Sequence, residues 1–323
     1  MRNKLLIIIL LIASFFLYFY SKKSADSNLP LVAIANYGPH SSLTDSIKGI
    51  KEELERQGFI ENENIRYDID DVSFDSNLIP QMVSKLKAKR PTVMIAMTTP
   101  VAQFAKHNVK DIPLIFNVIT DPIEAKLLKK KNQIDGNSSC TSDAQDLDLL
   151  LNFAKKLLPN ATRVGLLYST AEANDIALVK MLEKACYTTG MSLFAVPVDQ
   201  PRDVAIRMQS FKDKVDFIYV GTSGPIQPTL PVIVAEADKM NIPIFNVNEE
   251  AVQNNQVLAS FGVNYIQIGK NTGNMVAHIL KGGSLLPPIY PASEEHQGFI
   301  SKKRADSYGI KIPSDLKNVN IVE

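Results

Sequence analysis

The sequence predicts an α/β protein built from two parallel β-sheets that lie side by side, each covered by helices. Short runs rich in β-branched and aromatic residues alternate with amphipathic stretches, and this alternation occurs in both halves of the chain. Several strand candidates are apolar on both faces, as strands are when helices cover both sides of a sheet. With 323 residues, 45% of them apolar, the chain is long enough to build two cores.

In the first half, we expect strands at 31–35, 65–69, 92–97 and 114–119, and helices at 43–57, 78–86 and from Pro100 onward. The stretch 43–57 repeats apolar residues at helical spacing and stops at Gly58, a common C-terminal cap. Proline suits the first turn of a helix, so Pro100 marks the start of a short one.

In the second half, we expect strands at 163–168, 192–196, 217–220, 244–247 and 257–261, and helices at 147–158, 172–189, 204–211 and 233–240. A helix at 268–280, a strand at 298–300 and a helix at 302–308 follow. These last elements can complete both sheets only if the chain crosses from one sheet to the other more than once.

Composition and motifs exclude several classes of function. Lys and Arg number 35 against 34 for Asp and Glu, so no strong field favours nucleic acid as a partner. The two cysteines, Cys140 and Cys186, lack metal-ligand spacing, and we expect both to be free thiols. The four histidines form no motif, and no nucleotide-binding loop or nucleophile elbow is present. The sequence therefore predicts neither an enzyme nor a metal or other cofactor.

The N-terminus predicts export. Arg2 and Lys4 precede an uncharged run from Leu5 to Tyr20, which as a helix would span roughly 24 Å against the ~30 Å of a bilayer core. This pattern is typical of a secretory signal, but Ser21 and the residues after it form no clear cleavage site. Residues 1–30 are thus a cleaved signal peptide or an uncleaved anchor with a tether. Either places the protein in the periplasm or on the outer face of the cytoplasmic membrane.

Polar loops follow several of the expected strands. In open α/β sheets, ligands bind beyond the carboxyl ends of the strands. Hydroxyl groups and free N–H groups of helix N-termini there suit a carboxylate, whereas Asp121, Glu172 or Glu249 suits an ammonium. The candidate residues in these loops are Thr98, Thr99, Thr120, Asp121, Glu172, Asn174, Thr222, Ser223, Asn248 and Glu249. Each could equally be an ordinary helix cap. Tyr37 is a candidate for stacking on a ligand or for the core.

Four segments carry a family resemblance. They are Thr99-Pro-Val-Ala-Gln103, Val118-Ile-Thr-Asp-Pro122, Gly165-Leu-Leu-Tyr-Ser-Thr-Ala-Glu-Ala-Asn174 and Gly262-Val-Asn-Tyr-Ile-Gln-Ile-Gly269. With these segments in this order, the chain from about Leu31 to Leu316 resembles the ABC-transporter substrate-binding family whose better-known members take tryptophan, tyrosine or phenylalanine.

The resemblance implies a type I periplasmic-binding fold, in which two Rossmann-like lobes are joined by three crossovers and close on a ligand like a Venus flytrap. It implies one lobe from 31–137 and 264–290, and another from 138–263 and 292–323. The implied function is capture of a small polar solute, such as an amino acid, for an ABC permease and its ATPase, by a monomer. The residues that it places at the ligand are Thr98, Thr99, Thr120, Asp121, Glu172, Asn174 and Glu249.

The sequence departs from the family pattern at three acidic positions. Thr44, Ser223 and Asn248 stand where family members often carry Asp, which argues against a free ammonium on the ligand. A second reading of the function remains open: a membrane-tethered ligand-sensing module that works without a permease. Neighbouring genes for a permease and an ATPase would decide between the two.

Overall fold

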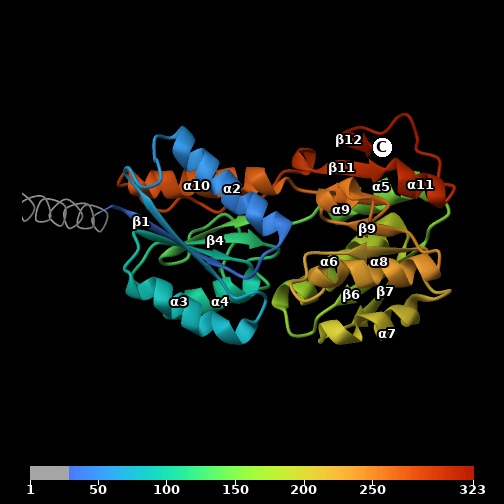
Figure 1. Cartoon of the computed structure of the whole chain (residues 1–323), viewed down its shortest axis with the longest axis horizontal. Helices are drawn as coiled ribbons and strands as arrows, with labels where there is room; N and C mark the ends of the chain where they lie inside the picture. The colour runs from blue at the N-terminus through green and yellow to red at the C-terminus, as the bar shows by residue number, and fades with distance from the viewer. Residues whose placement is uncertain (1–28) are drawn as a thin grey trace, which may run out of the picture.

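The computed structural model describes residues 29–323, so nearly all of the expected signal or anchor segment lies outside the described residues. Two α/β lobes lie side by side along the long axis of the molecule (Figure 1). Within the described part of the chain, no helix combines the length and the apolar character needed to cross a membrane.

The first lobe is built on a five-stranded parallel sheet. Its order is β2-β1-β3-β4-β5, from β1 (Leu31–Asn36), β2 (Arg66–Asp71), β3 (Val93–Met97), β4 (Leu114–Ile119) and β5 (Ser138–Ser142). Helices α3 (Ile79–Ala88) and α4 (Thr99–Asn108) cover one face, and α2 (Ser41–Arg56) and α10 (Tyr265–Leu280) cover the other (Figure 1). The inner strands β1, β3 and β4 are buried along their whole length, as their continuous apolar runs predict.

The second lobe contains a seven-stranded sheet of order β12-β11-β10-β9-β8-β6-β7. Its strands are β6 (Arg163–Tyr168), β7 (Ser192–Pro197), β8 (Phe217–Val220), β9 (Ile244–Asn246), β10 (Ala259–Gly262), β11 (Gln297–Ser301) and β12 (Val319–Val322). All neighbours are parallel except β10 and β11, which run antiparallel because the chain returns from the first lobe before it forms β11. Helices α5 (Leu147–Leu157) and α6 (Ala173–Thr189) pack on one face. The other face carries α7 (Val204–Met208), α8 (Leu230–Lys239) and α9 (Glu249–Gln253), and α11 (Lys302–Ser307) packs beside β11.

The chain passes between the two sheets three times: after β5, after β10 and before β11. One expected boundary is wrong, because residues 138–142 form β5 and pair with β4 in the first sheet rather than opening the second lobe. This strand has the sequence SSCTS, with no apolar run to indicate it, and its serine hydroxyls donate to backbone carbonyls of Ile119, Asp135 and Leu286. Cys140 in β5 and Cys186 in α6 are both buried and free, as predicted.

Helices α2 and α10 cross in direct backbone contact. A Cβ atom at Gly49 would overlap the carbonyl of Ile266, and one at Gly269 would overlap the carbonyl of Ser46. A buried polar chain adds to this contact, since Ser46 Oγ donates to Asn117 Oδ1 at 2.9 Å and Asn117 Nδ2 donates to Thr272 Oγ1 at 2.8 Å. Glycine at the crossing therefore ties α10, which enters from the second lobe, tightly to the first lobe.

Candidate functional site

A cavity lies between the lobes, at the carboxyl ends of the strands of both sheets. The space between its walls amounts to about 470 Å³ when the open solvent within it is counted. The first lobe contributes Tyr37, His40, Ser42, Leu43, Phe74, Thr98, Pro100 and Val118. The second lobe contributes Glu172, Asn174, Thr222, Ser223, Gly224, Gln227 and Val247, and the crossovers contribute Asp143 and Tyr265.

The first-lobe wall is largely apolar. Tyr37, directly after β1, packs edge-to-face on Phe74 with ring centroids 5.5 Å apart. Leu43, Pro100 and Val118 extend the apolar surface. His40 caps α2, because its Nδ1 accepts from the backbone N–H of Ser42 at 3.3 Å. Burial lowers the pKa of His40, against the opposing effects of Glu250 and Gln227, and thereby favours the neutral ring.

Two residues of this wall hold a strained backbone. Thr98 has φ of 71° and Val118 has φ of 58°, both in the region that β-branched residues rarely occupy. Thr98 directly precedes α4, and Val118 lies at a bulge in the pairing of β4 with β5. Such strain concentrates at functional sites, where the surrounding fold enforces it.

The second-lobe wall is a network of carboxylates and their donors. Glu172 Oε2 accepts from Asn174 Nδ2 at 3.2 Å and from the N–H of Gly224 at 3.3 Å. Behind it, Asp175 Oδ2 accepts from the N–H of Ser169 and from Ser223 Oγ, both at 2.6 Å. Burial raises the pKa of Glu172, and burial together with the charge of Glu172 raises the pKa of Asp175 to about 7.

Asp143 forms the floor of the cavity at the first crossover. Its side chain is fully buried, and burial raises its pKa to about 6, although Tyr265 donates to Oδ2 at 3.3 Å. The other oxygen, Oδ1, has no hydrogen-bond partner in the described part of the protein. A buried carboxylate oxygen without a donor is costly, so this position favours a ligand that brings one.

Three further buried polar atoms that belong to cavity-lining residues lack partners within residues 29–323: Ser42 Oγ, Thr98 Oγ1 and Asn174 Oδ1. Ser42 and Thr98 belong to the first lobe and Asn174 to the second, so a single ligand in the cavity would contact both lobes. Because buried polar groups are nearly always hydrogen-bonded, their concentration around one cavity indicates that a polar ligand completes them.

The lobes also touch each other directly across the cavity. Tyr37 Oη donates to Glu172 Oε1 at 3.0 Å, and the hydroxyls of Thr120 and Thr222 lie 3.2 Å apart. Ser41 contacts Asn248, and Lys180 pairs with Glu124, near the rim. Gly224 permits the closest approach, because a Cβ atom there would lie 2.6 Å from the Tyr37 ring and 2.9 Å from Glu172 Oε1.

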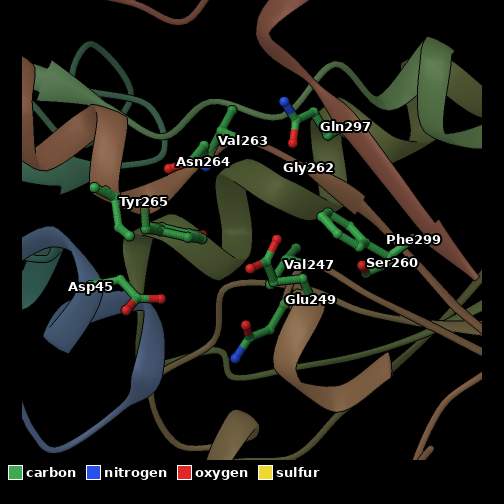
Figure 2. A pocket seen from close by; sticks show the side chains of 12 residues that line it. Asp45, Val247, Glu249, Ser260, Gly262, Val263, Asn264, Tyr265, Gln297 and Phe299 are labelled. Atoms are coloured by element: carbon green, nitrogen blue, oxygen red, sulfur yellow. The ribbon is translucent and has the colours of Figure 1, made fainter. Parts of the chain in front are cut away.

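A second pocket adjoins this cavity, since Val247 and Tyr265 line both, and Figure 2 shows its lining residues. Asp45 from α2 and Glu249 from α9 point into it from opposite lobes (Figure 2). Burial raises the pKa of both carboxyls, and for Glu249 the charge of Asp45 adds to the effect. Like charges face each other here, and within residues 29–323 no buried side-chain polar atom of this lining lacks a partner. This pocket is therefore less suited to a ligand than the cavity with the four unpartnered atoms.

The sequence-predicted residues divide between these places. Tyr37, Thr98, Glu172, Asn174, Thr222 and Ser223 line the cavity. Thr99 is buried in the first turn of α4 and Thr120 contacts Thr222, but neither lines the cavity. Asp121 accepts from the N–H groups of Ile123 and Glu124, which is the ordinary capping role left open above. Asn248 caps α9, and with Glu249 it faces the adjoining pocket.

Sequence reasoning missed several lining residues. Asp143 follows β5, so the rule that ligands meet strand ends would have found it had that strand been recognised. Phe74 and Gln227 lie in connecting segments whose position depends on the folded chain, and no local pattern indicated them. Asp175 does not line the cavity but supports Asn174 from behind, and in the sequence nothing distinguishes it from the other residues of its helix.

Comparisons with known proteins agree with this geometry. A family model described as "ABC transporter substrate binding protein" matches residues 31–320. The tyrosine-binding protein of Clostridioides difficile (strain R20291) is 29% identical over 265 residues, which cover 82% of this chain and 76% of that protein.

Two solved structures are informative about conformation. The ABC domain from Streptococcus pneumonia in complex with L-Trp superposes with a TM-score of 0.86 at 27% identity, over 92% of this chain and 100% of that one. The ligand-free, open structure of a Clostridium difficile substrate binding protein with adhesive properties gives 0.71 at 27% identity, over 91% and 99%. At equal identity, the present conformation is closer to that of the ligand complex, in line with the direct contacts between the lobes.

The predicted fold class is confirmed by these superpositions, and the family match assigns the chain to substrate-binding proteins and not to a class of enzymes, as predicted. The family model covers nearly the whole described chain, and the strand ends of both lobes converge on one cavity. The chain belongs to the ABC transporter substrate-binding protein family.

Proposed function

We propose that this substrate-binding protein captures an amino acid with an aromatic or other apolar side chain in the cavity between its lobes. Asp143 and Glu172 hold the ammonium group, the hydroxyls of Ser42 and Thr98 donate to the carboxylate, and Tyr37 and Phe74 form part of the apolar wall for the side chain. The observation that carries the proposal is the set of unpartnered polar atoms of Ser42, Thr98, Asp143 and Asn174 around one cavity.

The relatives support the ligand class. One is named a tyrosine-binding protein, and another was solved with L-Trp. The neutral residues Thr44, Ser223 and Asn248, which argued against an ammonium, do not leave the cavity without negative charge. Asp143 and Glu172 line it, and both are buried. A buried carboxylate is stabilised by a cationic partner, so an ammonium is the group that this site lacks.

Native mass spectrometry of the purified protein, followed by calorimetric titration, tests the proposal. We expect a co-purified amino acid, or micromolar or tighter binding of L-tyrosine or L-tryptophan, and no binding of L-glutamate, whose second carboxylate would enter an acidic cavity. Binding of a sugar, or of L-glutamate in preference to both aromatic amino acids, would contradict it.

We further propose that the protein acts outside the cytoplasmic membrane as a monomer, held or exported by residues 1–30, and delivers its ligand to a permease and ATPase. The uncharged run from Leu5 to Tyr20 supports export. Alkaline extraction of membranes separates the alternatives, since a cleaved protein is released and an uncleaved anchor stays with the lipid. Retention of all the protein in the cytoplasmic fraction would contradict both.

A further inference from the structure

The side-chain amide of Asn174 has only one orientation that its surroundings permit. Its Nδ2 atom lies 2.9 Å from Asp175 Oδ1, 3.2 Å from Glu172 Oε2 and 3.5 Å from the carbonyl oxygen of Thr222. All three neighbours are acceptors. Turning the amide by half a rotation would place its own oxygen against the ionised carboxylates and the carbonyl oxygen of Thr222, none of which has a proton to donate. The NH₂ group must therefore face these residues.

This orientation decides what Asn174 offers to the cavity. Its Oδ1 atom is buried, lacks a partner in the described part of the chain, and belongs to a residue that is 6% exposed and lines the cavity. An amide oxygen only accepts hydrogen bonds. In this geometry Asn174 therefore cannot donate a hydrogen bond to the carboxylate of the ligand.

Asp175, which lies on the side of Asn174 away from the cavity, fixes the orientation of the Asn174 amide. It is 1% exposed, and it is held by the N–H of Ser169 and the hydroxyl of Ser223, each 2.6 Å from Oδ2. This leaves Oδ1 to accept from Asn174 at 2.9 Å. The carboxylate thus ties the loop after β6 to the loop after β8 and aims the amide between them. It does not line the cavity itself.

We propose that Asp175 is a positioning residue that sets the polarity of Asn174, so that Asn174 Oδ1 joins Glu172 and Asp143 as an acceptor for the ammonium group of the ligand. The inference rests on the proposed function and refines it. An ammonium has three N–H donors and no acceptor, which matches three acceptors drawn from the second lobe and the crossover. Asn174 then selects for the amino group of the ligand and not for its carboxylate.

The test measures selectivity for the amino group. Calorimetry gives the Kd of the full-length protein for L-tryptophan and for 3-indolepropionate, which differs only by lacking the amino group. L-tyrosine and 3-(4-hydroxyphenyl)propionate form a second pair. We expect the unmodified protein to prefer each amino acid strongly over its partner. Asp175→Asn keeps the shape of the side chain but can donate to Asn174 Oδ1 and let the amide turn.

In Asp175→Asn we expect the Kd for the amino acid to rise by about ten- to a hundredfold, the loss of one charge-assisted bond, while the Kd for the des-amino acid changes little. Asp199→Asn is the matched control, because that carboxylate also accepts from a loop of the second lobe, at Thr170, but is exposed. It should leave the selectivity unchanged.

Asn174→Ala provides an independent variant if Asp175→Asn folds poorly. It should also weaken binding of the amino acid and spare the des-amino acid. Equal losses for both ligands in either variant would mean that Asn174 meets the carboxylate or that Asp175 acts only on the fold, and would overturn the inference. Equal affinity of the unmodified protein for both ligands would overturn it as well. Failure of the unmodified protein to bind any amino acid would refute the proposed function with it, a result seen before any variant is made.

Discussion

The two walls of the cavity differ in charge and in how they are held. Among the described residues, no carboxylate belongs to the first-lobe wall, which presents Tyr37, Phe74, other apolar groups and the hydroxyls of Ser42 and Thr98. The backbone of Thr98 is strained. The second-lobe wall presents Glu172 with Asp175 behind it, fixed by side-chain hydrogen bonds rather than by backbone strain. The contrast teaches how the proposed ligand would be divided between the lobes. The first lobe would contact its apolar side chain and its carboxylate, and the second lobe would contact its ammonium group.

Removing the charge of Glu172 from the second-lobe wall should have the largest effect on ligand affinity. In Glu172→Gln, the side chain keeps its shape but loses its charge-assisted bond to the ligand. Affinity for the amino acid should fall by about ten- to a hundredfold in calorimetric titration. Glu183→Gln, an exposed change on α6, is the control and should bind normally. Unchanged affinity in Glu172→Gln would mean that the charged wall is not where the ammonium lies.

Preventing the two walls from closing on each other should have the next largest effect on ligand affinity. Gly224→Ala places a methyl group 2.6 Å from the Tyr37 ring, an overlap between lobes that exists only in the closed state, and 2.9 Å from Glu172 Oε1, the end of a side chain in the same lobe. We expect about a tenfold loss of affinity and a nearly unchanged melting temperature of the unliganded protein. Adding Tyr37→Ala should relieve the clash, so the two losses should not add. Additive losses would place the effect of Gly224→Ala elsewhere.

Changing the pH should change the stability of the protein through Asp175 behind the second-lobe wall and Asp143 at the first crossover. Asp175 and Asp143 have pKa values raised to about 7 and about 6, whereas an unfolded Asp has about 3.9. Between about pH 4 and pH 7 the folded protein therefore binds more protons than the unfolded chain, and its free energy of unfolding falls as pH rises. By calorimetry, we expect the unliganded protein to melt several degrees lower at about pH 8 than at about pH 5.

Asp175→Asn should flatten this pH dependence, because the replaced group no longer titrates. Saturating L-tryptophan should flatten it too, since an ammonium stabilises the ionised carboxylates. A melting temperature that rises over the same range would contradict the assignment of the buried acids.

The smallest expected effect is a gain of ligand affinity instead of a loss. Asp45 and Glu249 approach each other from opposite lobes in the pocket beside the cavity, and each charge opposes closure. Glu249→Gln should therefore tighten ligand binding by about two- to fivefold at low salt, and less at high salt. A weaker affinity in this variant would show that Glu249 contributes to the ligand site after all.

The fold could be predicted from the sequence where hydrophobic periodicity was strong. Strands β4, β6 and β8 lie where the apolar runs placed them. Strand β5 could not be predicted, because SSCTS is stabilised by hydroxyl bonds to distant carbonyls that exist only in the folded chain. The rule that ligands bind beyond the carboxyl ends of strands correctly predicted that Thr98, Glu172 and Asn174 line the cavity. The same rule could not distinguish them from Asp121, whose carboxylate caps its own turn. It also could not find Phe74, which reaches the cavity by tertiary packing alone.

The glycine contact between α2 and α10 has a mechanical consequence. Tyr265 begins α10 at the second crossover, and α2 carries His40 and Ser42 at its cavity end. Because the two backbones are in direct contact at Gly49 and Gly269, we expect these helices to move together when the lobes rotate relative to each other. A displacement of α10 at the second crossover would then carry His40 and Ser42 with it, so that the crossover and this part of the cavity wall move as one unit.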